Sequence, residues 1–523
     1  MARVLVTEKI AQNGLDLLAE AGHDVDVQEG LTEEQLIATI PGASALIIRS
    51  ATQVTEAVLS AASDLIVVGR AGIGLDNVDV PAATARGVMV VNAPQSNIVS
   101  AAEQTMALML AIARNVPQAH SALMGGKWER SKWEGVELYE KTLGVFGLGR
   151  IGALVAQRAL AFGMKLVAYD PYISAERAKR MGVELLTVDE VVAQSDFITI
   201  HLPKNKETID LFNLELLKKA KPSLRLINVA RGGIVNEDDL AVALREGIIA
   251  GAALDVFTKE PTTESPLFEL SNIVVAPHLG ASTVEAQDKA GLTIAEQLIL
   301  ALNQEFVPFA VNVSAGEVSG AVAPFMPVAE QLGRFFAGLH DVAPKNLQIE
   351  FAGDLAGAGT KILTLSVLKG FLGANSSEPV SYVNAPQLAE AQSLTVEETS
   401  TVVSHDFVNL ITLRTADHSL SGTLAGVGIR TEPRIVSVDD HLVDVKPMKD
   451  MLVVRNDDRP GMIGGVGTVL GSAGVSITRM AVGPSREGNT ALMVLATSGP
   501  ASDDVLSHLR SIDGILNVHR VSL

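Results

Sequence analysis

Three residues whose side chains could do acid–base chemistry come shortly after predicted strands. Arg231 follows Asn-Val-Ala, Glu260 follows Leu-Asp-Val-Phe, and His278 follows Ile-Val-Val-Ala-Pro. In an open α/β sheet, ligands bind beyond the carboxyl ends of the strands, so these side chains are expected to meet there. A histidine suits proton exchange with a hydroxyl, and a glutamate beside it would fix its tautomer. An arginine would bind a carboxylate through paired hydrogen bonds and polarise the adjacent carbonyl.

Each of these residues alone also has an ordinary explanation. His278 could be a satisfied loop histidine, Glu260 a solvated turn residue and Arg231 a surface cation. All three follow strands of the same predicted sheet, after a glycine-rich dinucleotide site that is described next. Coincidence is therefore a poor explanation for all three together. His201 also ends a predicted strand, but no carboxylate and arginine match it, so we expect it to be structural or to line the cofactor cleft.

A glycine-rich segment predicts the dinucleotide site. The segment Gly147-Leu-Gly149-Arg-Ile-Gly152 lies between a predicted strand and a predicted helix, and Asp170 ends the next strand 18 residues further on. The glycines permit a tight turn and a close approach of the pyrophosphate to the helix N-terminus. Asp170 would accept hydrogen bonds from the ribose hydroxyls and repel a 2′-phosphate, which favours NAD over NADP. The alternative is a glycine-rich turn with a solvent-facing aspartate.

Two series of short apolar strands, alternating with helical stretches, would position these residues. We expect the strands at 3–7, 24–27, 45–49, 65–69 and 88–92, and then at 142–146, 165–170, 197–201, 224–229, 249–256 and 273–276. This order predicts the α/β class with mainly parallel sheets. Ser100 and Glu103 have the spacing of a capping box and predict the start of a connecting helix.

Composition limits the function further. At roughly 150 residues per domain, 523 residues predict three or four domains. The absence of cysteine excludes disulfides, cysteine–zinc sites, iron–sulfur clusters and thiol nucleophiles, and we predict no metal site. A net charge of −19 argues against binding to nucleic acid or to an anionic membrane. Because no apolar run approaches the length of a membrane span and the N-terminus has no secretory pattern, we expect a soluble, cytoplasmic protein.

The C-terminal part differs from the rest in its loop composition and in its predicted elements. A stretch at 307–327 with Pro, Gly and Ser predicts a hinge, and the unit at about 328–445 begins with a helical run and contains strands at 346–351 and 409–414. The function of this unit cannot be read from its residues. The last 75 residues predict the order βαββαβ of a small ferredoxin-like domain, with a turn at 456–461.

These motifs together resemble the D-isomer-specific 2-hydroxyacid dehydrogenases. The segments that carry the resemblance are Gly147-Leu-Gly-Arg-Ile-Gly152, Asn228-Val-Ala-Arg-Gly-Gly-Ile-Val235, Ala253-Leu-Asp-Val-Phe257 and Ala276-Pro-His-Leu-Gly-Ala-Ser-Thr283. The resemblance implies a Rossmann NAD-binding domain at 97–282, inserted in a flavodoxin-like substrate domain at 1–96 and 283–306. An α+β intervening domain at 307–449 and a regulatory domain at 450–523, similar to ACT domains, would follow.

The resemblance also implies a role for each site residue. His278 would be the general base, Glu260 its partner and Arg231 the carboxylate-binding group. The implied NAD contacts come from the glycine-rich segment and from Ile73, Arg150, Ile151, Asp170, Leu202, Val229, Ala230 and Asp255. The implied substrate contacts are Arg49, Arg70 and, from a neighbouring subunit, Arg130.

The activity that the resemblance implies is oxidation of D-3-phosphoglycerate to 3-phosphohydroxypyruvate with NAD, the entry step of L-serine biosynthesis. Alternatives are a dehydrogenase of another 2-hydroxy acid, such as glyoxylate or hydroxypyruvate, and an NAD-sensing scaffold. The ACT-like domain implies L-serine as an effector, with Asn456 and Asp458 as its contacts, although Ser476 stands where the family commonly has Asn. Relatives imply a homotetramer.

Overall fold

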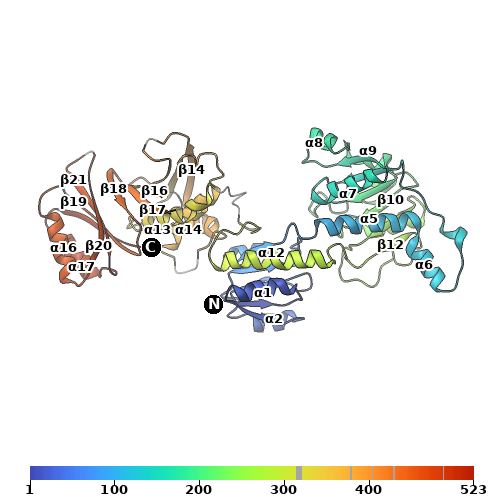
Figure 1. Cartoon of the computed structure of the whole chain (residues 1–523), viewed down its shortest axis with the longest axis horizontal. Helices are drawn as coiled ribbons and strands as arrows, with labels where there is room; N and C mark the ends of the chain where they lie inside the picture. Colours follow the sequence, from blue (N-terminus) through green and yellow to red (C-terminus); the bar gives the residue numbers. More distant parts are fainter. Residues whose placement is uncertain (314–320, 377–379, 405, 428–429, 487) are drawn as a thin grey trace.

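The computed structural model describes residues 1–313, 321–376, 380–404, 406–427, 430–486 and 488–523. Within these residues the chain forms four β-sheets (Figure 1). Two parallel sheets belong to the N-terminal part of the chain and two largely antiparallel sheets to the C-terminal part. No described helix is long and apolar enough to span a lipid bilayer.

The first sheet has five parallel strands in the flavodoxin-like order β2-β1-β3-β4-β5. Helices cover both of its faces, so its central strands are buried runs of Ala, Val, Leu and Ile. Its strands are β1 (Arg3–Val6), β2 (Asp24–Val27), β3 (Ala45–Ile48), β4 (Val67–Arg70) and β5 (Met89–Asn92), and its helices are α1 (Gln12–Glu20), α2 (Glu33–Thr39), α3 (Glu56–Ala61), α4 (Val80–Ala85) and α12 (Val284–Leu302).

The second sheet has seven parallel strands in the order β12-β11-β10-β9-β6-β7-β8, which is the doubly wound order of a Rossmann domain. Its strands are β6 (Thr142–Phe146), β7 (Lys165–Tyr169), β8 (Glu184–Leu185), β9 (Phe197–Ile200), β10 (Arg225–Asn228), β11 (Gly251–Leu254) and β12 (Ile273–Val275). Its helices are α5 (Ile98–Arg114), α6 (Val116–Met124), α7 (Arg150–Ala161), α8 (Ala175–Arg180), α9 (Val188–Gln194), α10 (Leu214–Leu217) and α11 (Glu237–Arg245), with a 3₁₀ turn at Arg130–Trp133.

Two helices connect the first two sheets. The chain leaves the first sheet after β5 and enters the second through α5, whose apolar face packs in the core of the second sheet. It returns through α12, whose apolar face packs on the first sheet. The second sheet is therefore an insertion in the first domain, and α5 and α12 are the two connections between them (Figure 1).

The segment after α12 attaches to the edge of the first sheet. The Val311 amide donates to the Val90 carbonyl at 2.8 Å, and Ala310 pairs with Val91 as an antiparallel bridge. The Asn312 side chain accepts a hydrogen bond from the Val90 amide at 2.9 Å. The chain thus runs along the outer edge of β5 before it enters its C-terminal part.

The third and fourth sheets form the C-terminal part. The third has the order β14-β13-β15-β16-β17-β18, and the fourth has the ferredoxin-like order β20-β21-β19-β22. The third unit contains α13 (Met326–Ala337), β13 (Asn346–Gly353), α14 (Lys361–Gly373), α15 (Ala385–Ala391), β14 (Thr395–Thr401), β15 (Asn409–Arg414), β16 (Ser419–Val427), β17 (Arg430–Val438) and β18 (His441–Val445), after a 3₁₀ turn at Ala323–Phe325. The fourth contains β19 (Asp450–Asp457), α16 (Met462–Ser472), β20 (Ile477–Pro484), β21 (Thr490–Thr497), α17 (Asp503–Arg510) and β22 (Ile515–Ser522).

A continuous core joins these two units. Met451, Val453 and Val494 of the fourth sheet belong to the same buried cluster as α13 and α14. The opposite face of the fourth sheet packs under α16 and α17 in a separate cluster. The third unit therefore covers one whole face of the fourth sheet.

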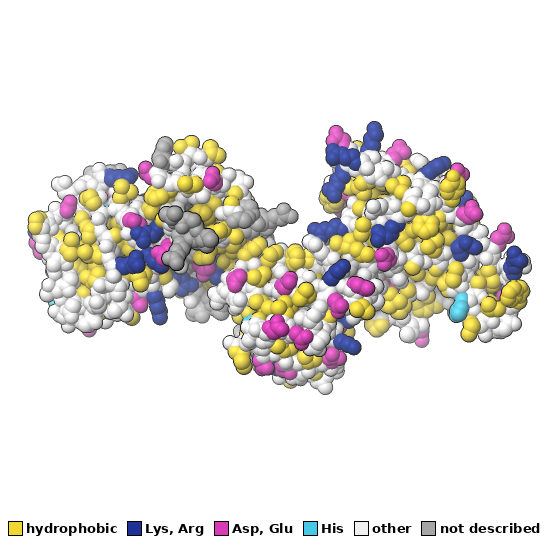
Figure 2. Space-filling view, viewed as in Figure 1, with side chains coloured by type: hydrophobic (Ala, Val, Ile, Leu, Met, Phe, Trp, Pro, Cys, Tyr) yellow, Lys and Arg dark blue, Asp and Glu magenta, His cyan; other side chains and the backbone are white. Residues whose placement is uncertain are grey.

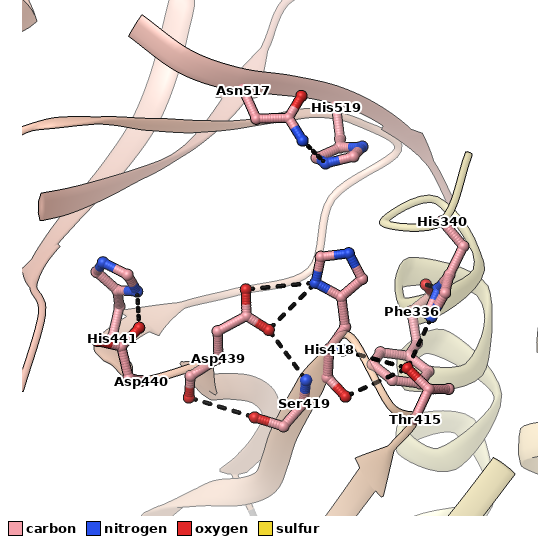
Figure 3. Close-up of polar contacts among 10 residues, drawn as sticks. All are labelled: Phe336, His340, Thr415, His418, Ser419, Asp439, Asp440, His441, Asn517 and His519. Carbon is pink, nitrogen blue, oxygen red and sulfur yellow. Dashed lines mark hydrogen bonds and ion pairs between the residues drawn. The ribbon is translucent and has the colours of Figure 1, made fainter. Parts of the chain in front are cut away.

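Polar side chains line the boundary between these units (Figure 3). His418 donates from Nδ1 to both carboxylate oxygens of Asp439, at 3.2 and 3.3 Å. The hydrogen bond that His418 donates to Asp439 is the main cause that raises the pKa of His418 above its usual value. A cavity of about 240 Å³ lies between His418 of the third unit and His519 of β22. Beside this cavity the side chain of Asn517, also on β22, contacts Nε2 of His519 at 2.7 Å. The two units thus face each other through imidazole rings as well as through the shared core.

The predicted fold class is confirmed: a Rossmann sheet is inserted in a flavodoxin-like one, and α+β and ferredoxin-like units follow. One local prediction is wrong. Helix α5 begins at Ile98 with Asn97 as its N-terminal cap, and Ser100 lies inside the first turn, where its hydroxyl bonds to that of Thr283 at 2.8 Å. The turn predicted at 456–461 begins later, because β19 continues through Asp457. Part of the hinge predicted at 307–327 lies outside the described residues.

Close packing of α1 on α12 gives a test of this architecture. A Cβ atom added to Gly14 would lie 2.6 Å from the carbonyl oxygen of Gly291. We expect Gly14→Ala to force the helices apart and to lower the free energy of unfolding by about 1–3 kcal/mol. Thermal unfolding of the full chain measures the change.

The matched control is Gly464→Ala on α16, where the added Cβ meets no atom within 4 Å. That substitution is expected to leave stability unchanged or to raise it by about 0.5–1 kcal/mol, because alanine favours the helix. Equal melting temperatures for Gly14→Ala and wild type would contradict the close contact.

Candidate active site

A cavity of about 760 Å³ opens between the first two sheets, at the carboxyl ends of their strands. Loops that follow β1, β3 and β4 line it from one side, and loops that follow β11 and β12 line it from the other. Glu260, His278, Arg49 and Arg70 all contribute to its wall. The cavity thus brings residues from distant parts of the chain to the place where an open α/β fold binds ligands.

His278 and Glu260 form a direct pair. Nδ1 of His278 lies 2.5 Å from Oε2 of Glu260, and the other carboxylate oxygen accepts a hydrogen bond from the Phe257 amide at 2.9 Å. Burial acts to raise the pKa of Glu260, but the hydrogen bonds from His278 and Phe257 outweigh it and hold that pKa below its usual value. The carboxylate therefore stays charged and keeps Nδ1 of the histidine protonated. Nε2 remains for a ligand in the cavity.

The loop that carries His278 is held by Asp255. The buried carboxylate of Asp255 accepts hydrogen bonds from the amides of Leu279 and Gly280, both at 2.8 Å. The His278 amide donates to the Asp255 carbonyl at 2.8 Å, and His278 adopts a left-handed backbone conformation with a φ of 53°. Burial raises the pKa of Asp255, although these two amides oppose it. The structure therefore gives this predicted cofactor residue a second task, which is to shape the histidine loop.

Arg231 lies in the loop after β10, beside the cavity. The buried Asn228 shapes this loop, since its side chain donates to the Arg231 carbonyl at 2.9 Å and accepts from the Ala230 amide at 3.0 Å. The guanidinium donates to the Ala230 carbonyl at 2.7 Å, and its Nε lies 3.4 Å from a carboxylate oxygen of Asp76. Because Asp76 belongs to the first sheet and Arg231 to the second, this ion pair crosses the cleft.

The glycine-rich segment has the geometry that a pyrophosphate needs. Gly147 directly follows β6 and has a φ of 93°, and a Cβ atom there would lie 2.7 Å from the His201 carbonyl oxygen. Gly149 caps α7 and has open space around it, so the helix N-terminus is accessible to an anion. Asp170 lies beside this turn, where its carboxylate accepts from the Leu148 amide at 2.7 Å. These residues fit a bound dinucleotide, with Arg150 and Ile151 in the first turn of the helix.

The remaining predicted cofactor residues surround the same edge of the second sheet. Leu202 is buried against the glycine-rich turn, and Val229 and Ala230 follow β10. Ile73 lies in the loop after β4, and its carbonyl accepts a hydrogen bond from the Asn92 side chain at 2.7 Å. His201 is half-buried behind the turn, where its Nε2 atom lies 2.9 Å from the Thr199 hydroxyl, and loss of solvation lowers its pKa to about 4.

Two of the three predicted substrate arginines share the cavity. Arg70 is largely buried, and this burial lowers its pKa to about 10. Arg49 lies on the loop after β3. Arg130 does not reach the cavity of its own chain, because it lies exposed in the 3₁₀ turn beyond α6. Among the described residues, no cluster of His, Cys, Asp or Glu is arranged to hold a metal ion.

Surface charge is unevenly distributed. On the face shown in Figure 2, acidic side chains gather over the domain of α1 and α2, and basic side chains gather near α8. The net charge of −19 therefore does not exclude an anion from the cleft, where Arg49 and Arg70 provide local positive charge.

The predicted effector residues lie in the fourth unit. Asn456 is almost completely buried near the end of β19, and its Oδ1 atom has no hydrogen-bond partner among the described residues. Asp458 is exposed in the turn that follows. Ser476 is exposed just before β20.

Sequence reasoning assigned no role to three residues that shape the cleft, namely Glu8, Asp76 and Asn77. Asp76 and Asn77 stand in the loop after β4, close to the predicted residue Ile73, so their position was visible but their contacts were not. Glu8 follows the first strand, in the same topological position as the residues that were chosen. Its position was therefore the only available signal.

Comparison with protein families matches three segments of the chain. Residues 106–280 match the NAD-binding domain of the D-isomer specific 2-hydroxyacid dehydrogenases. Residues 321–439 match the D-3-phosphoglycerate dehydrogenase intervening domain, and residues 451–514 match the ACT domain. The three matches follow the order of the second, third and fourth sheets.

Full-length relatives carry one name. The chain is 46% identical over 509 residues to D-3-phosphoglycerate dehydrogenase of Mycobacterium tuberculosis H37Rv, covering 96% of each chain. It is 42% identical over 530 residues to the enzyme of that name from Synechocystis, covering 100% of this chain and 95% of the relative. It is 39% identical over 526 residues to that of Methanocaldococcus jannaschii, covering 100% of both.

Solved structures match somewhat more than half of the chain. The TT0316 protein of Thermus thermophilus is 34% identical, with a TM-score of 0.56 over 59% of this chain and 99% of its own. An NAD-dependent formate dehydrogenase from Staphylococcus aureus in complex with NAD is 31% identical, with a TM-score of 0.52 over 58% of this chain and 96% of its own.

The position of Asp170 beside the glycine-rich turn predicts how the enzyme selects its cofactor. We expect Asp170→Ala to raise the KM for NAD and to reduce the preference for NAD over NADP, because the carboxylate no longer bonds to the ribose hydroxyls or repels a 2′-phosphate. Steady-state kinetics with both cofactors measure the preference. Asp170→Asn is the matched control for charge, and an unchanged preference in both variants would assign ribose recognition to another group.

Proposed function

The chain belongs to the D-3-phosphoglycerate dehydrogenase family of NAD-dependent enzymes, and from this premise we propose how its cleft oxidises D-3-phosphoglycerate to 3-phosphohydroxypyruvate. The observation that carries the proposal is the His278–Glu260 pair, at 2.5 Å, in the same cavity as two arginines. A proton acceptor and groups for two anionic ends of one substrate are then within one site. The glycine-rich turn and Asp170 would hold NAD, which would supply the acceptor for the hydride of substrate C2.

His278 acts as the general base. Its Nδ1 proton is held by Glu260, so Nε2 is free to take the proton of the C2 hydroxyl as the carbonyl forms. Glu260 remains ionised and stabilises the imidazolium that results. In the reverse direction the same Nε2 returns the proton to the oxygen. Asp255 keeps the imidazole ring in place, because it accepts hydrogen bonds from the amides of the loop that carries His278.

The arginines bind and polarise the substrate. Arg231 binds the carboxylate and polarises the adjacent carbonyl, after it leaves its ion pair with Asp76. Arg49 and Arg70 bind the phosphate from the first domain. Because the substrate then contacts both domains, its binding draws the two walls of the cleft together.

The C-terminal units regulate the enzyme through an end product. We propose L-serine as the effector, bound at Asn456 and Asp458. The buried Oδ1 atom of Asn456 lacks a partner among the described residues, and an amino-acid ammonium group would supply one. Ser476 offers a shorter polar group than the asparagine common at its position, so the affinity is expected to be modest.

We also propose that copies of this chain associate, in keeping with a homotetramer. Helix α6 and the loop after it carry large apolar side chains in solvent, including Met124 at 75% and Trp128 at 83% exposure. Such a patch is typical of a surface that another protein covers. Arg130 follows directly, so association through this patch would carry it to a neighbouring copy's surface.

The catalytic roles can be tested by measuring NADH formation from D-3-phosphoglycerate and from non-phosphorylated D-2-hydroxy acids. We expect His278→Ala to lower kcat by about 10²- to 10⁴-fold, because the proton acceptor is lost, and to leave the Kd for NADH unchanged. Glu260→Gln should cause a smaller loss. A kcat similar to wild type in His278→Ala would remove the residue from this role, and equal turnover of all acids would contradict the substrate.

The regulatory role has a separate test. L-serine is expected to inhibit the wild-type enzyme, and Asn456→Ala should raise the concentration for half inhibition by about tenfold or more, because a buried hydrogen bond to the effector is lost. Ser476→Asn serves as the opposite variant and should strengthen inhibition. Initial rates at several serine concentrations give the concentration for half inhibition of the wild type and of both variants. No inhibition in wild type or in Ser476→Asn would contradict serine as the effector.

A further inference from the structure

The loop 49–52 after β3 is neither helix nor strand, yet three of its four backbone amides donate to one side chain. Oε1 of Glu8 accepts hydrogen bonds from the amides of Arg49 at 2.7 Å and Thr52 at 2.9 Å. Oε2 accepts from the Ala51 amide at 3.1 Å. Glu8 stands just after β1, so a neighbouring strand of the same sheet provides the acceptor that the loop lacks.

Asn77 holds the carbonyl groups of the same loop. Its Nδ2 atom donates to the carbonyl of Arg49 at 2.8 Å and to that of Thr52 at 2.6 Å. The Thr52 hydroxyl is also bonded to that of Thr7, at 2.9 Å. Side chains on two sides therefore fix the loop, and its remaining freedom lies in the side chains that face the cavity.

The charge of Glu8 is part of this arrangement. Burial acts to raise its pKa, but the hydrogen bonds from Thr52, Ala51 and Arg49 outweigh it and hold that pKa below its usual value. The carboxylate is therefore ionised near neutral pH. Burial and repulsion from Arg231 lower the pKa of Arg70. The negative charges of Asp76 and Glu8 lie close enough to Arg70 to oppose this effect.

We propose that Glu8 is a positioning residue that sets the specificity of the enzyme for a phosphorylated acid. It does not touch the substrate, but it fixes the backbone of the loop 49–52 and so directs the Arg49 guanidinium into the cavity that contains His278. This inference rests on the proposed function, in which Arg49 binds the phosphate. A loop that is ordered before binding loses little conformational entropy when the phosphate arrives.

The test compares two acids that differ only in the phosphate. NADH-dependent reduction of 3-phosphohydroxypyruvate and of hydroxypyruvate is measured for wild type, Glu8→Gln and the matched control Glu29→Gln, whose residue is exposed in the same domain. Glutamine keeps the size of Glu8 but presents an NH₂ group to one of the loop amides. We expect Glu8→Gln to raise the KM for the phosphorylated acid about tenfold, with kcat within about twofold. The kcat/KM for hydroxypyruvate, the KM for NADH and all values for Glu29→Gln should stay unchanged.

Two results would overturn the proposal. An unchanged ratio of kcat/KM between the two acids in Glu8→Gln would show that the loop does not need the carboxylate. Equal losses for both acids and for NADH would show a purely structural role. If Glu8→Gln does not fold, Glu8→Asp, which keeps the charge but shortens the reach, carries the same comparison and the same criteria.

A third variant separates this inference from the proposed function. Arg49→Ala should lower the ratio of kcat/KM more strongly than Glu8→Gln, because it removes the phosphate contact itself. If Arg49→Ala leaves the ratio unchanged, the proposed phosphate site is wrong, whatever Glu8 does. If Arg49→Ala lowers the ratio and Glu8→Gln does not, only the inference about Glu8 is wrong.

Discussion

Hydrogen bonds from loop amides to carboxylates hold the cleft in shape. Asp255 accepts hydrogen bonds from two amides of the histidine loop, and Glu260 accepts one from the Phe257 amide. Asp170 accepts one from the Leu148 amide, and Glu8 accepts three from amides of the loop that carries Arg49. Each of these loops begins where a strand ends, so its amides lose their ladder partners. A charged acceptor bonds to such amides more strongly than a neutral one. An enzyme whose substrate carries two anionic groups thus keeps several carboxylates near its site, because most of these carboxylates bind backbone amides.

Much of the fold and of the candidate site could be predicted from the sequence. Parallel strands point their carboxyl ends to one edge, so Arg231, Glu260 and His278 could be grouped without coordinates. Most strands of the first two sheets lie within two residues of the predicted ranges, because they are buried apolar runs bounded by turn residues. Gly147 could be chosen because only glycine tolerates its φ and its contact with His201.

Other features depend on contacts between distant segments, which a sequence does not display. The ion pair of Arg231 with Asp76 and the amides on Glu8 join residues far apart in the chain. Strand β14 reads Thr-Val-Glu-Glu-Thr-Ser-Thr and is mostly exposed at a sheet edge, so it lacks the apolar pattern by which strands are recognised. The cap of α5 was misplaced because a capping-box spacing describes local bonds only, and tertiary packing begins this helix earlier.

The segment at 309–312 has a consequence beyond connection. Strand β5 is the last strand of its sheet, and an uncovered strand edge pairs readily with other chains. The segment at 309–312 occupies that edge through the Val311 amide and the Asn312 side chain. A catalytic fragment that stops at the end of α12 would keep every residue of the cleft and still expose this edge to aggregation. The segment that leads into the C-terminal units thus also covers the open edge of the first sheet.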